Sequence, residues 1–534
     1  MDRDYDVIVV GSGAAGVHAA HPLVTAGLRV LMLDGGIPPP HILQEPPPGS
    51  FTEMRSRSYE QIRWFVGKDL SLLCSNMELS GMIGGNRDFV TRHTEALLPL
   101  QPRDHEEVAQ TLAEGGLASA WGGACAYFSD AELAQMGLPP GDMRRSYADV
   151  TRLIGVAGPL THPSVQPPPR LDHHARLILD ASRRRAARLQ ILGATVRPPH
   201  TAILTEALGK RRPCGYSDLE YYSDADQSLY RANFTLEELR RHDCFTYQPS
   251  VRIERIEERE GLAHVHGHLF SDGHVRAPVH ERGRAVILAA GAVGTGRILL
   301  ESLRLHDTPL PFISKSHVFT ACLHPGTIGR AGDDRRSALC QLLVTLPPTT
   351  HRVGVCAQLY SYRSFLLYRL LPQLPFPVPE SLDILSIFSP SLVIAGLRFA
   401  SPGANGTMTL AGNGVLSVQI QEQVRSNARY RRALQDIKRA LRIVGLIPLR
   451  TRFMPEGSSF HYAGAVPIAS ADASLLTAEN DGRVRGLRST YVADASLFPL
   501  LPAEPPALTI MANARRIGQK LSVRLRNTSR TPPP

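Results

Sequence analysis

The sequence predicts an α/β protein with two lobes, and three observations support this. Residues 6–16 run an apolar strand directly into a glycine-rich turn, a pattern typical of a nucleotide-binding βαβ unit. Residues 251–279 alternate apolar and polar side chains, which predicts antiparallel strands. The 534 residues exceed what one hydrophobic core usually serves, so we expect two lobes.

The βαβ unit opens the chain and predicts a dinucleotide site. Gly11 allows a tight turn, Gly13 lets the backbone approach a pyrophosphate, and Gly16 lets the helix pack closely on the strand. Amides at the start of that helix then face the phosphate anion. A second strand, residues 30–34, ends at Asp34, whose carboxylate can accept hydrogen bonds from both ribose hydroxyls of an adenosine. A purely structural turn is disfavoured, because strand, glycines, helix, strand and acid occur in this order.

A loop over residues 114–123 places five small residues around Trp121. Glycine permits close approach of the backbone to a ligand, so we interpret this loop as backbone laid against a flat group. An ordinary loop with a packed tryptophan is the alternative, and both readings stay open for this segment by itself.

The alternating segment from residue 251 predicts a β-meander with a turn at residues 271–273. A fully apolar run, residues 285–294, follows and ends in small residues, which suits the centre of a parallel sheet that ends at the nucleotide. One strand of the meander carries three histidines on one face: His264, His266 and His268. No further ligand lies nearby in the sequence, so we expect a solvent-facing polar edge and no metal site.

Residues 306–455 carry fewer local signals. Residues 384–397 are uncharged, but these fourteen residues fall short of the roughly 20 that span a bilayer, so we expect a buried strand pair or an apolar substrate wall. Residues 365–371 could contact a membrane surface, although a packed core is favoured. Residues 427–446 predict an amphipathic helix that returns the chain to the nucleotide.

The composition is that of a soluble globular protein, with 43% hydrophobic and 20% charged residues. The formal net charge of +10 comes from arginine, because only five of the 59 basic residues are lysines. Arg183 to Arg185 lie on a helix predicted over residues 172–189. Neither interleaved aromatic residues nor a nucleic-acid module accompanies them, so we predict no nucleic-acid binding.

The expected compartment is the cytoplasm. The N-terminus leads directly into the first strand, without the basic segment and apolar run of a signal peptide. The seven cysteines are scattered and never form a Cys-x-x-Cys pair, so reduced thiols are expected.

Three spaced motifs lie near the C-terminus: residues 459–464 (Ser-Phe-His-Tyr-Ala-Gly), 491–499 and 506–514. Together they resemble the closing motifs of the glucose-methanol-choline (GMC) oxidoreductases. The opening glycine fingerprint, residues 115–123 and residues 289–297 match the same family in the same order. The resemblance spans residues 1 to about 525 and is thin between 306 and 450.

This resemblance implies FAD bound in an extended pose and a two-lobed, GMC/PHBH-like fold. A Rossmann-like FAD-binding domain would carry the cofactor, and a second domain of mostly antiparallel β-sheet plus helices would roof the substrate face of the flavin. The implied FAD-binding domain is discontinuous and comprises residues 1–125, 215–305 and 456–525. Residues 126–214 and 306–455 would form the substrate domain, and residues 526–534 a flexible tail.

By position, the resemblance also implies which residues contact FAD. The opening turn and Asp34 would hold the ADP half, Trp121 would lie beside the isoalloxazine, and Val251 would contact adenine through its backbone. Asp494 would meet the ribityl-phosphate region and Leu508 the pyrimidine end. The full implied set is Gly11, Ser12, Gly13, Ala14, Ala15, Gly16, Asp34, Gly35, Gly115, Gly116, Ser119, Trp121, Gly122, Val251, Ala290, Gly291, Asp494, Ala495, Leu508 and Thr509.

His461 is the residue to which the resemblance gives a catalytic role. Hydride leaves an alcohol carbon only as the hydroxyl proton is lost, so a base must lie within hydrogen-bond reach of that oxygen, and imidazole titrates near neutrality. A packed core histidine is the alternative. The family generally has a second histidine or asparagine, but the matching position here is Pro505, which has no donor. The site must then rely on His461 alone, recruit a donor such as Tyr462 or Glu504, or use different chemistry.

Three functions remain open. The favoured one is an FAD-dependent oxidoreductase that oxidises a CH–OH group of a small hydroxylated substrate, such as a sugar, a glycolipid or another metabolite. Its electron acceptor, whether oxygen, a quinone or a protein carrier, is undetermined. The alternatives are a lyase that keeps FAD as a structural element and a non-catalytic flavin-binding interaction protein. A flavin disulfide reductase is disfavoured, because residues 291–296 lack the spacing of a second dinucleotide fingerprint.

Overall fold

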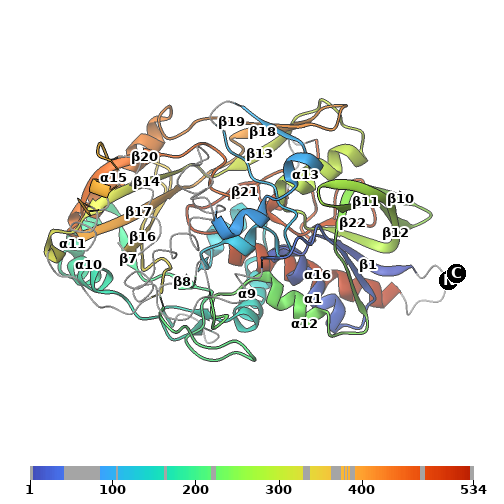
Figure 1. Ribbon diagram of the computed structural model, residues 1–534, viewed down its shortest axis with the longest axis horizontal. Coiled ribbons are helices and arrows are strands. Elements are labelled where there is room, and N and C mark those ends of the chain that lie inside the picture. The colour runs from blue at the N-terminus through green and yellow to red at the C-terminus, as the bar shows by residue number, and fades with distance from the viewer. Residues whose placement is uncertain are drawn as a thin grey trace.

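The computed structural model describes residues 4–40, 85–103, 106–160, 165–217, 220, 224–328, 337–361, 374–377, 379–381, 383–384, 391–468 and 475–528. Figure 1 shows two lobes side by side. One is built around β1 (Tyr5–Val10), α1 (Ala14–Thr25) and α16 (Ala507–Thr528), and the other around β14 (His317–Leu323), β17 (Leu392–Phe399) and α15 (Ala428–Ile443). The predicted two-lobed α/β fold is confirmed.

A parallel sheet forms the centre of the first lobe. Val7, Ile8 and Val9 of β1 are fully buried, as expected of a parallel strand that is covered on both faces. Helix α1 connects β1 to the parallel strand beside it, which completes the predicted βαβ unit. The parallel strands lie in the order β22 (Thr490–Val492), β12 (His274–Leu288), β1, β2 (Val30–Leu33) and β9 (Phe245–Gln248).

Strand β12 belongs both to the meander and to the parallel sheet. Its first part pairs antiparallel with β11 (Leu262–Ser271), which pairs with β10 (Val251–Arg259), so the predicted meander is confirmed. Its last residues, 285–288, pair in parallel with β1 and β22. The meander and the apolar central strand were expected as separate runs, but residues 280–284 stay extended and join them into one strand.

The histidines of the meander lie against one another. His264 Nδ1 is 3.0 Å from His280 Nε2, and the ring of His266 stacks on that of His280 with 4.6 Å between centroids. In the described part of the chain, no group of three or more histidine, cysteine, aspartate or glutamate side chains could hold a metal ion.

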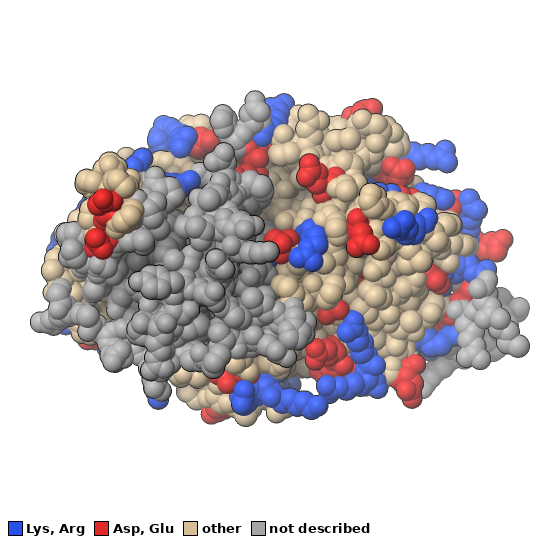
Figure 2. Space-filling model, viewed as in Figure 1, with Lys and Arg blue, Asp and Glu red and all other residues tan. Residues whose placement is uncertain are grey.

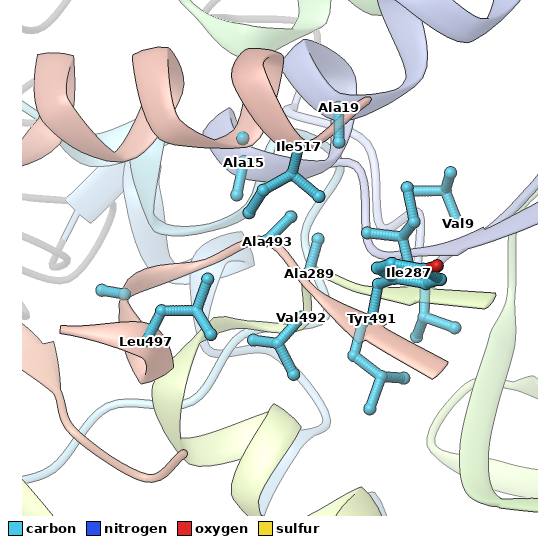
Figure 3. Packing of buried hydrophobic residues seen from close by; sticks show 14 of the residues in the cluster. Val9, Ala15, Ala19, Ile287, Ala289, Tyr491, Val492, Ala493, Leu497 and Ile517 are labelled. Carbon is cyan, nitrogen blue, oxygen red and sulfur yellow. The ribbon is translucent and has the colours of Figure 1, made fainter. Parts of the chain in front are cut away.

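Helices α1 and α16 pack against each other and on the parallel sheet (Figure 3). Ala15 and Ala19 of α1 and Ile517 of α16 lie over Ala289, and all four are buried in one core. Small side chains allow this close approach. A Cβ atom added to Gly518 of α16 would lie 2.2 Å from the carbonyl oxygen of Ala19.

Several further helices complete the first lobe. Helix α9 packs on α16, where the Tyr147 and Thr509 hydroxyls are 2.6 Å apart. Met143 and Val150 of α9 belong to the core of the first lobe, although the predicted domain boundaries assign them to the second. Those boundaries stay a prediction. Besides α1 and α16, the α-helices in the described part of this lobe are α7 (Thr94–Leu97), α8 (Asp130–Gln135), α9 (Pro140–Ile154), α12 (Ala232–Leu239) and α13 (Gly291–Ser302).

An antiparallel sheet forms the second lobe, with α15 packed on it. The predicted helix over residues 427–446 is confirmed as α15. The helix predicted over residues 172–189 is instead two helices, α10 (His173–Arg184) and α11 (Ala186–Leu192), which meet where the Arg185 side chain turns to bind the Ile443 carbonyl. The strand order is β20 (Ile447–Phe453), β14, β17, β16 (Val355–Ser361), β15 (Leu342–Leu346) and β7 (Thr195–Arg197).

For residues 384–397 the sequence predicts a buried strand pair or an apolar substrate wall, and the strand pair is wrong in part. Residues 392–399 form the single strand β17, which pairs with β14 and β16 rather than with a neighbour in its own segment. Residues 385–390 lie outside the described part of the chain, as do residues 365–371, for which membrane contact was considered.

A third sheet lies between the two lobes (Figure 1). Its strand β13 pairs with β21, which follows His461 directly, so this sheet positions the predicted catalytic residue. Its order is β21 (Tyr462–Ala463), β13 (Leu310–Ser314), β18 (Gly406–Leu410), β19 (Leu416–Ile420) and β3 (Leu100–Pro102). A small fourth sheet contains β4 (Ala124–Cys125), β8 (His200–Thr201), β5 (Val156–Ala157) and β6 (Val165–Gln166).

Basic and acidic side chains are interspersed on the face shown in Figure 2. Helix α10 follows this pattern, since Arg183 forms an exposed ion pair with Asp180 at 3.1 Å. None of the helices in the described ranges is both long and apolar enough to cross a bilayer. The cytoplasmic location and the absence of nucleic-acid binding stay predictions.

Substituting Gly518→Ala tests the contact between α1 and α16. The added methyl group would collide with the backbone of Ala19, so we expect a loss of about 2 kcal/mol or more in the free energy of unfolding. Gly141→Ala on α9 is the matched control, because an added Cβ meets nothing within 4 Å there. Chemical denaturation of both variants would measure the difference, and equal stabilities would contradict the packing.

Candidate functional site

One cavity joins the parallel sheet of the first lobe to the antiparallel sheet of the second. It begins at the carboxyl ends of β1 and β2, which is where open α/β sheets bind ligands. It ends at His461 and Pro505, beneath strands β14, β16 and β17. The predicted site residues that line it are Gly11, Ser12, Gly13, Ala14, Ala15, Asp34, Gly35, Gly116, Trp121, Gly122, Val251, Ala290, Gly291, His461, Asp494, Ala495 and Pro505.

The N-terminus of α1, which no side chain caps, faces this cavity. Gly13 is its N-cap residue, no side chain accepts a hydrogen bond there, and the first turn holds no acidic residue. Gly11 has a φ of 100°, and an added Cβ would lie 2.6 Å from the Ala289 carbonyl oxygen. Gly16 does not line the cavity. It packs against the opening turn, where an added Cβ would lie 1.8 Å from the Gly11 carbonyl oxygen. Free amides at a helix N-terminus favour an anion such as a diphosphate.

Ser12 connects the opening turn to the predicted ribose-binding acid. The Ser12 backbone N–H donates to Asp34 Oδ1 at 3.0 Å, and its hydroxyl donates to Asp34 Oδ2 at 2.6 Å. The same hydroxyl accepts a hydrogen bond from the Gly115 N–H at 2.9 Å. Tyr247 donates to Asp34 Oδ2 at 2.9 Å. Burial raises the pKa of Asp34, and the hydrogen bonds from Ser12 and Tyr247 oppose that rise.

The loop around Trp121 lines the cavity and is anchored by contacts to protein groups. Gly115 and Ser119 do not line it, because the Ser119 hydroxyl donates to the Glu114 carbonyl and Gly115 packs against Asn233. Trp121 lines the cavity, and its indole N–H donates to the Tyr230 carbonyl at 2.7 Å. These bonds fix the ring and the backbone beside it, as the flat-ligand interpretation requires.

Asp494 binds the start of α13 and the cavity wall together. Its Oδ2 accepts from the Thr295 hydroxyl at 2.5 Å, and its Oδ1 accepts from the Ser496 N–H at 2.9 Å. Burial raises the pKa of this carboxyl. Leu508 and Thr509 are fully buried and do not line the cavity, so their contact with a cofactor stays a prediction.

His461 occupies the reactive end of the cavity. Phe460 before it has a φ of 60°, in the left-handed region that bulky residues seldom adopt, and both side chains reach the cavity. The buried Nδ1 of His461 has no hydrogen-bond partner in the described part of the chain. Burial, and then the positive charges of Lys315 and Arg398, lower the pKa of His461 well below 6.5. The imidazole is therefore neutral at neutral pH and able to accept a proton.

Tyr462 and Glu504 were the two candidates to replace the side-chain donor that Pro505 lacks, and both are engaged in other hydrogen bonds. The Tyr462 hydroxyl donates to the Gly457 carbonyl at 2.6 Å and accepts from the Ala109 N–H at 3.0 Å. The Glu504 carboxylate binds Arg197 at 2.6 Å and does not line the cavity. Of the three options that the sequence left open for this position, recruitment of Tyr462 or Glu504 has no support in the geometry.

Four residues at the reactive end escaped the sequence reasoning: Phe319 on β14, Gln358 and Tyr360 on β16, and Arg398 on β17. Tyr360 donates to Gln358 at 3.2 Å, and the Arg398 guanidinium lies 5.8 Å from the centre of the Phe319 ring. No local motif marks them, because strand pairing across distant segments brings them together. The one available signal is Arg398 itself, a charge that directly follows the uncharged run and lies near the end of β17.

The residues of this cavity fit FAD. Uncapped amides suit a diphosphate, Asp34 suits a ribose, and the small-residue loop beside Trp121 suits a flat ring. The same cavity that is lined by these groups is also lined by His461.

Comparisons with known proteins agree with this site. Residues 450–514 match the family model described as GMC oxidoreductase. That segment is GMC-type. The resemblance seen in the sequence is thereby confirmed.

Relatives and solved structures extend the comparison. Two proteins from two strains of Mycobacterium tuberculosis, each called an uncharacterized GMC-type oxidoreductase, are 29% identical to this chain over 153 residues. The match covers 25% of this chain and 24% of each relative, so the chain spans about a quarter of the length of these GMC relatives. Pyridoxine 4-oxidase from Mesorbium loti has the same fold, with a TM-score of 0.61 and 14% identity over 97% of this chain and 99% of that one.

Gly13→Ala separates cofactor binding from folding. An alanine there would meet only the backbone of Gly115 and Gly116, at 3.8–3.9 Å, and the φ of −61° suits it. We therefore expect a thermal unfolding midpoint of the apoprotein close to that of the wild type. The new methyl group would occupy the diphosphate position, so we expect purified protein to have lost most of its flavin absorbance. Gly141→Ala is the control, and unchanged flavin content in Gly13→Ala would contradict the assignment.

Proposed function

We propose that this protein is an FAD-dependent oxidoreductase that oxidises a CH–OH group of a small hydroxylated substrate. The observation that carries the proposal is one cavity that joins the uncapped N-terminus of α1 to a neutral histidine in a GMC-type C-terminal segment. The first feature suits a dinucleotide, and the second suits a base for an alcohol.

The chain would hold FAD with groups already oriented towards the cavity. The first-turn amides of α1 would bind the diphosphate, Asp34 the ribose, and the backbone near Val251 the adenine. Bound FAD supplies a two-electron acceptor for the hydride from the substrate carbon. The loop around Trp121 and the six-stranded sheet of the second lobe would enclose the reacting atoms and exclude water.

His461 would take the hydroxyl proton of the substrate. Its neutral imidazole accepts that proton as the carbon loses hydride, so the alcohol loses two electrons and two hydrogens and becomes a carbonyl compound. Turnover would also require an external electron acceptor, which would be oxygen, a quinone or a protein carrier. Because Pro505 supplies no donor, proton transfer depends on His461 alone.

The cavity supports a substrate with both apolar and polar surfaces. Phe319 and Tyr360 offer aromatic contacts, and Gln358 and Arg398 offer polar ones at the reactive end. Sugars, glycolipids and other hydroxylated metabolites are the proposed class. Pyridoxine, an aromatic alcohol named in the structural relative, belongs in the same substrate screen.

A second function is favoured by one observation. Pro505 removes the donor that polarises the substrate oxygen in the family, and a lyase that keeps FAD as a structural element would not need it. Turnover by protein reconstituted with a redox-inactive flavin analogue would indicate the lyase. Loss of turnover with that analogue would support oxidation.

Anaerobic mixing with candidate alcohols tests the proposed oxidation. We expect a substrate to bleach the flavin absorbance, and His461→Ala to slow this reduction by about 10²-fold or more while retaining the flavin. His351→Asn, on an exposed loop, is the matched control and should react like the wild type. An unchanged reduction rate in His461→Ala would remove that residue from the mechanism.

The pH dependence of that reduction tests the charge state of His461. The base form exists above the pKa of the imidazole, and burial with two nearby cations holds that pKa well below 6.5. We therefore expect the acidic limb of the rate profile to lie below the ordinary histidine value of 6.5. Stopped-flow measurements across the acidic range would check this, and a limb at or above that value would show a solvated, ordinary histidine.

A further inference from the structure

Lys315 is a buried lysine at the reactive end of the molecule. It lies between β13 and β14 and is 0% exposed. Lysine is almost never fully buried without a partner, because its ammonium loses the hydration of water. The chain has only five lysines beside its many arginines, and this one lies next to the site described above.

Lys315 binds the two segments that carry His461 and Pro505. Its backbone N–H donates to the His461 carbonyl at 3.2 Å, which continues the pairing of β13 with β21. Its Nζ donates to the carbonyl of Glu504 at 2.5 Å, directly before Pro505. The bond partners are backbone atoms on both sides, so one residue fixes the spacing between the two segments.

The backbone around Lys315 is itself held in place. The side-chain amide of Asn405 accepts from the Ser314 N–H and donates to the Ser314 carbonyl, both at 2.9 Å. On the other side, the Phe399 N–H donates to the Ser316 carbonyl at 3.2 Å. The position of Lys315 is therefore set by three sheet segments, and its side chain transmits that position to residue 504.

We propose that Lys315 is a positioning residue for the oxidation: it holds His461 and Pro505 at a fixed spacing and places one titratable positive charge beside the imidazole. This inference rests on the proposed function. Lys315 does not line the cavity, so it would not contact the substrate. Its charge would instead influence the reaction electrostatically, through the pKa of His461 and the charge on the substrate oxygen.

Several groups face the Lys315 ammonium. The pKa of Lys315 is lowered to about 7, mainly by burial and, in the same direction, by the positive charge of Arg398 on β17. Glu504 before α16, Glu132 on α8 and Cys356 on β16 act in the opposite direction. The ammonium is therefore charged below about pH 7 and neutral above it.

The charge has two effects on the reaction. It keeps His461 neutral, because the Lys315 charge lowers the pKa of that imidazole. It also stabilises negative charge on the substrate oxygen as the proton leaves. Since the second effect disappears when the ammonium loses its proton, oxidation should slow as the pH rises through about 7.

An NMR titration of the holoprotein tests the charge directly and needs no substrate. With lysine labelled at 13Cε, the five lysines give few resonances, and Lys315→Met identifies its own by loss. We expect the Lys315 resonance, identified in this way, to titrate near pH 7. Identification matters because burial also lowers the pKa of Lys438. If Lys315→Met does not fold, variants of the other four lysines assign the resonance by elimination. The inference is overturned if the Lys315 resonance does not titrate below about pH 9.

The rate of anaerobic flavin reduction tests the positioning. We expect Lys315→Met to be slower than the wild type by about tenfold or more near pH 6, with the gap narrowing towards about pH 9 as the wild type loses its charge. Lys210→Met, at an exposed position, is the control and should follow the wild type. A loss in Lys315→Met of equal size at every pH, with a lower unfolding midpoint, would reduce Lys315 to a structural role.

These two measurements separate the inference from the proposed function. A lysine that titrates near pH 7, in a protein whose flavin no alcohol reduces, would preserve the assigned position and charge of Lys315 and refute the oxidation. Flavin reduction by an alcohol without such a titration, or with a pH profile that Lys315→Met leaves unchanged, would support the oxidation and refute the role of Lys315.

Discussion

The close approach of α1 to β1 is the contact on which the rest of the site depends. Gly11 and Gly16 bring helix and strand together at a distance that excludes a Cβ atom, so the helix starts directly at the end of the strand. Its first amides therefore point into the cavity without a capping side chain. Ser12, between the two glycines, then binds Asp34 and Gly115. One turn thus fixes the start of α1, Asp34 and the small-residue loop relative to each other.

The sequence predicts the parts of this site that lie close together along the chain. The opening turn, Asp34 and the meander follow from local patterns, because glycine, acid and alternation each constrain a short segment. The motif around His461 could be assigned only through a family resemblance. Lys315 and Arg398 could not be predicted, because their neighbours lie far away along the chain: Lys315 binds the carbonyl of Glu504, and Arg398 pairs with His317 on β14. Periodicity gives the strand, but it does not give the partner strand.

The two ends of the cavity differ in how they control charge. At the nucleotide end, backbone amides at a helix start provide a fixed and pH-independent preference for anions. At the end that contains His461, buried and charged side chains control the charge instead. Burial, and then the positive charges of Lys315 and Arg398, lower the pKa of His461. A cofactor that must stay bound is served by the first arrangement. A base that must be neutral to accept a proton would be served by the second, because burial and nearby positive charges both lower the pKa of the imidazole.

Pro505 is consistent with this division. Proline fixes its own φ and offers no N–H, and with Pro506 it leads directly into α16, whose Ile510 N–H donates to the Pro506 carbonyl. The segment is thus a stiff wall rather than a polar group. The hydrogen bond from Lys315 Nζ to the carbonyl of Glu504, directly before Pro505, fixes the position of this rigid segment. Pro505 offers no side-chain donor, and the buried positive charge at the other end of this hydrogen bond is that of Lys315, directly after β13.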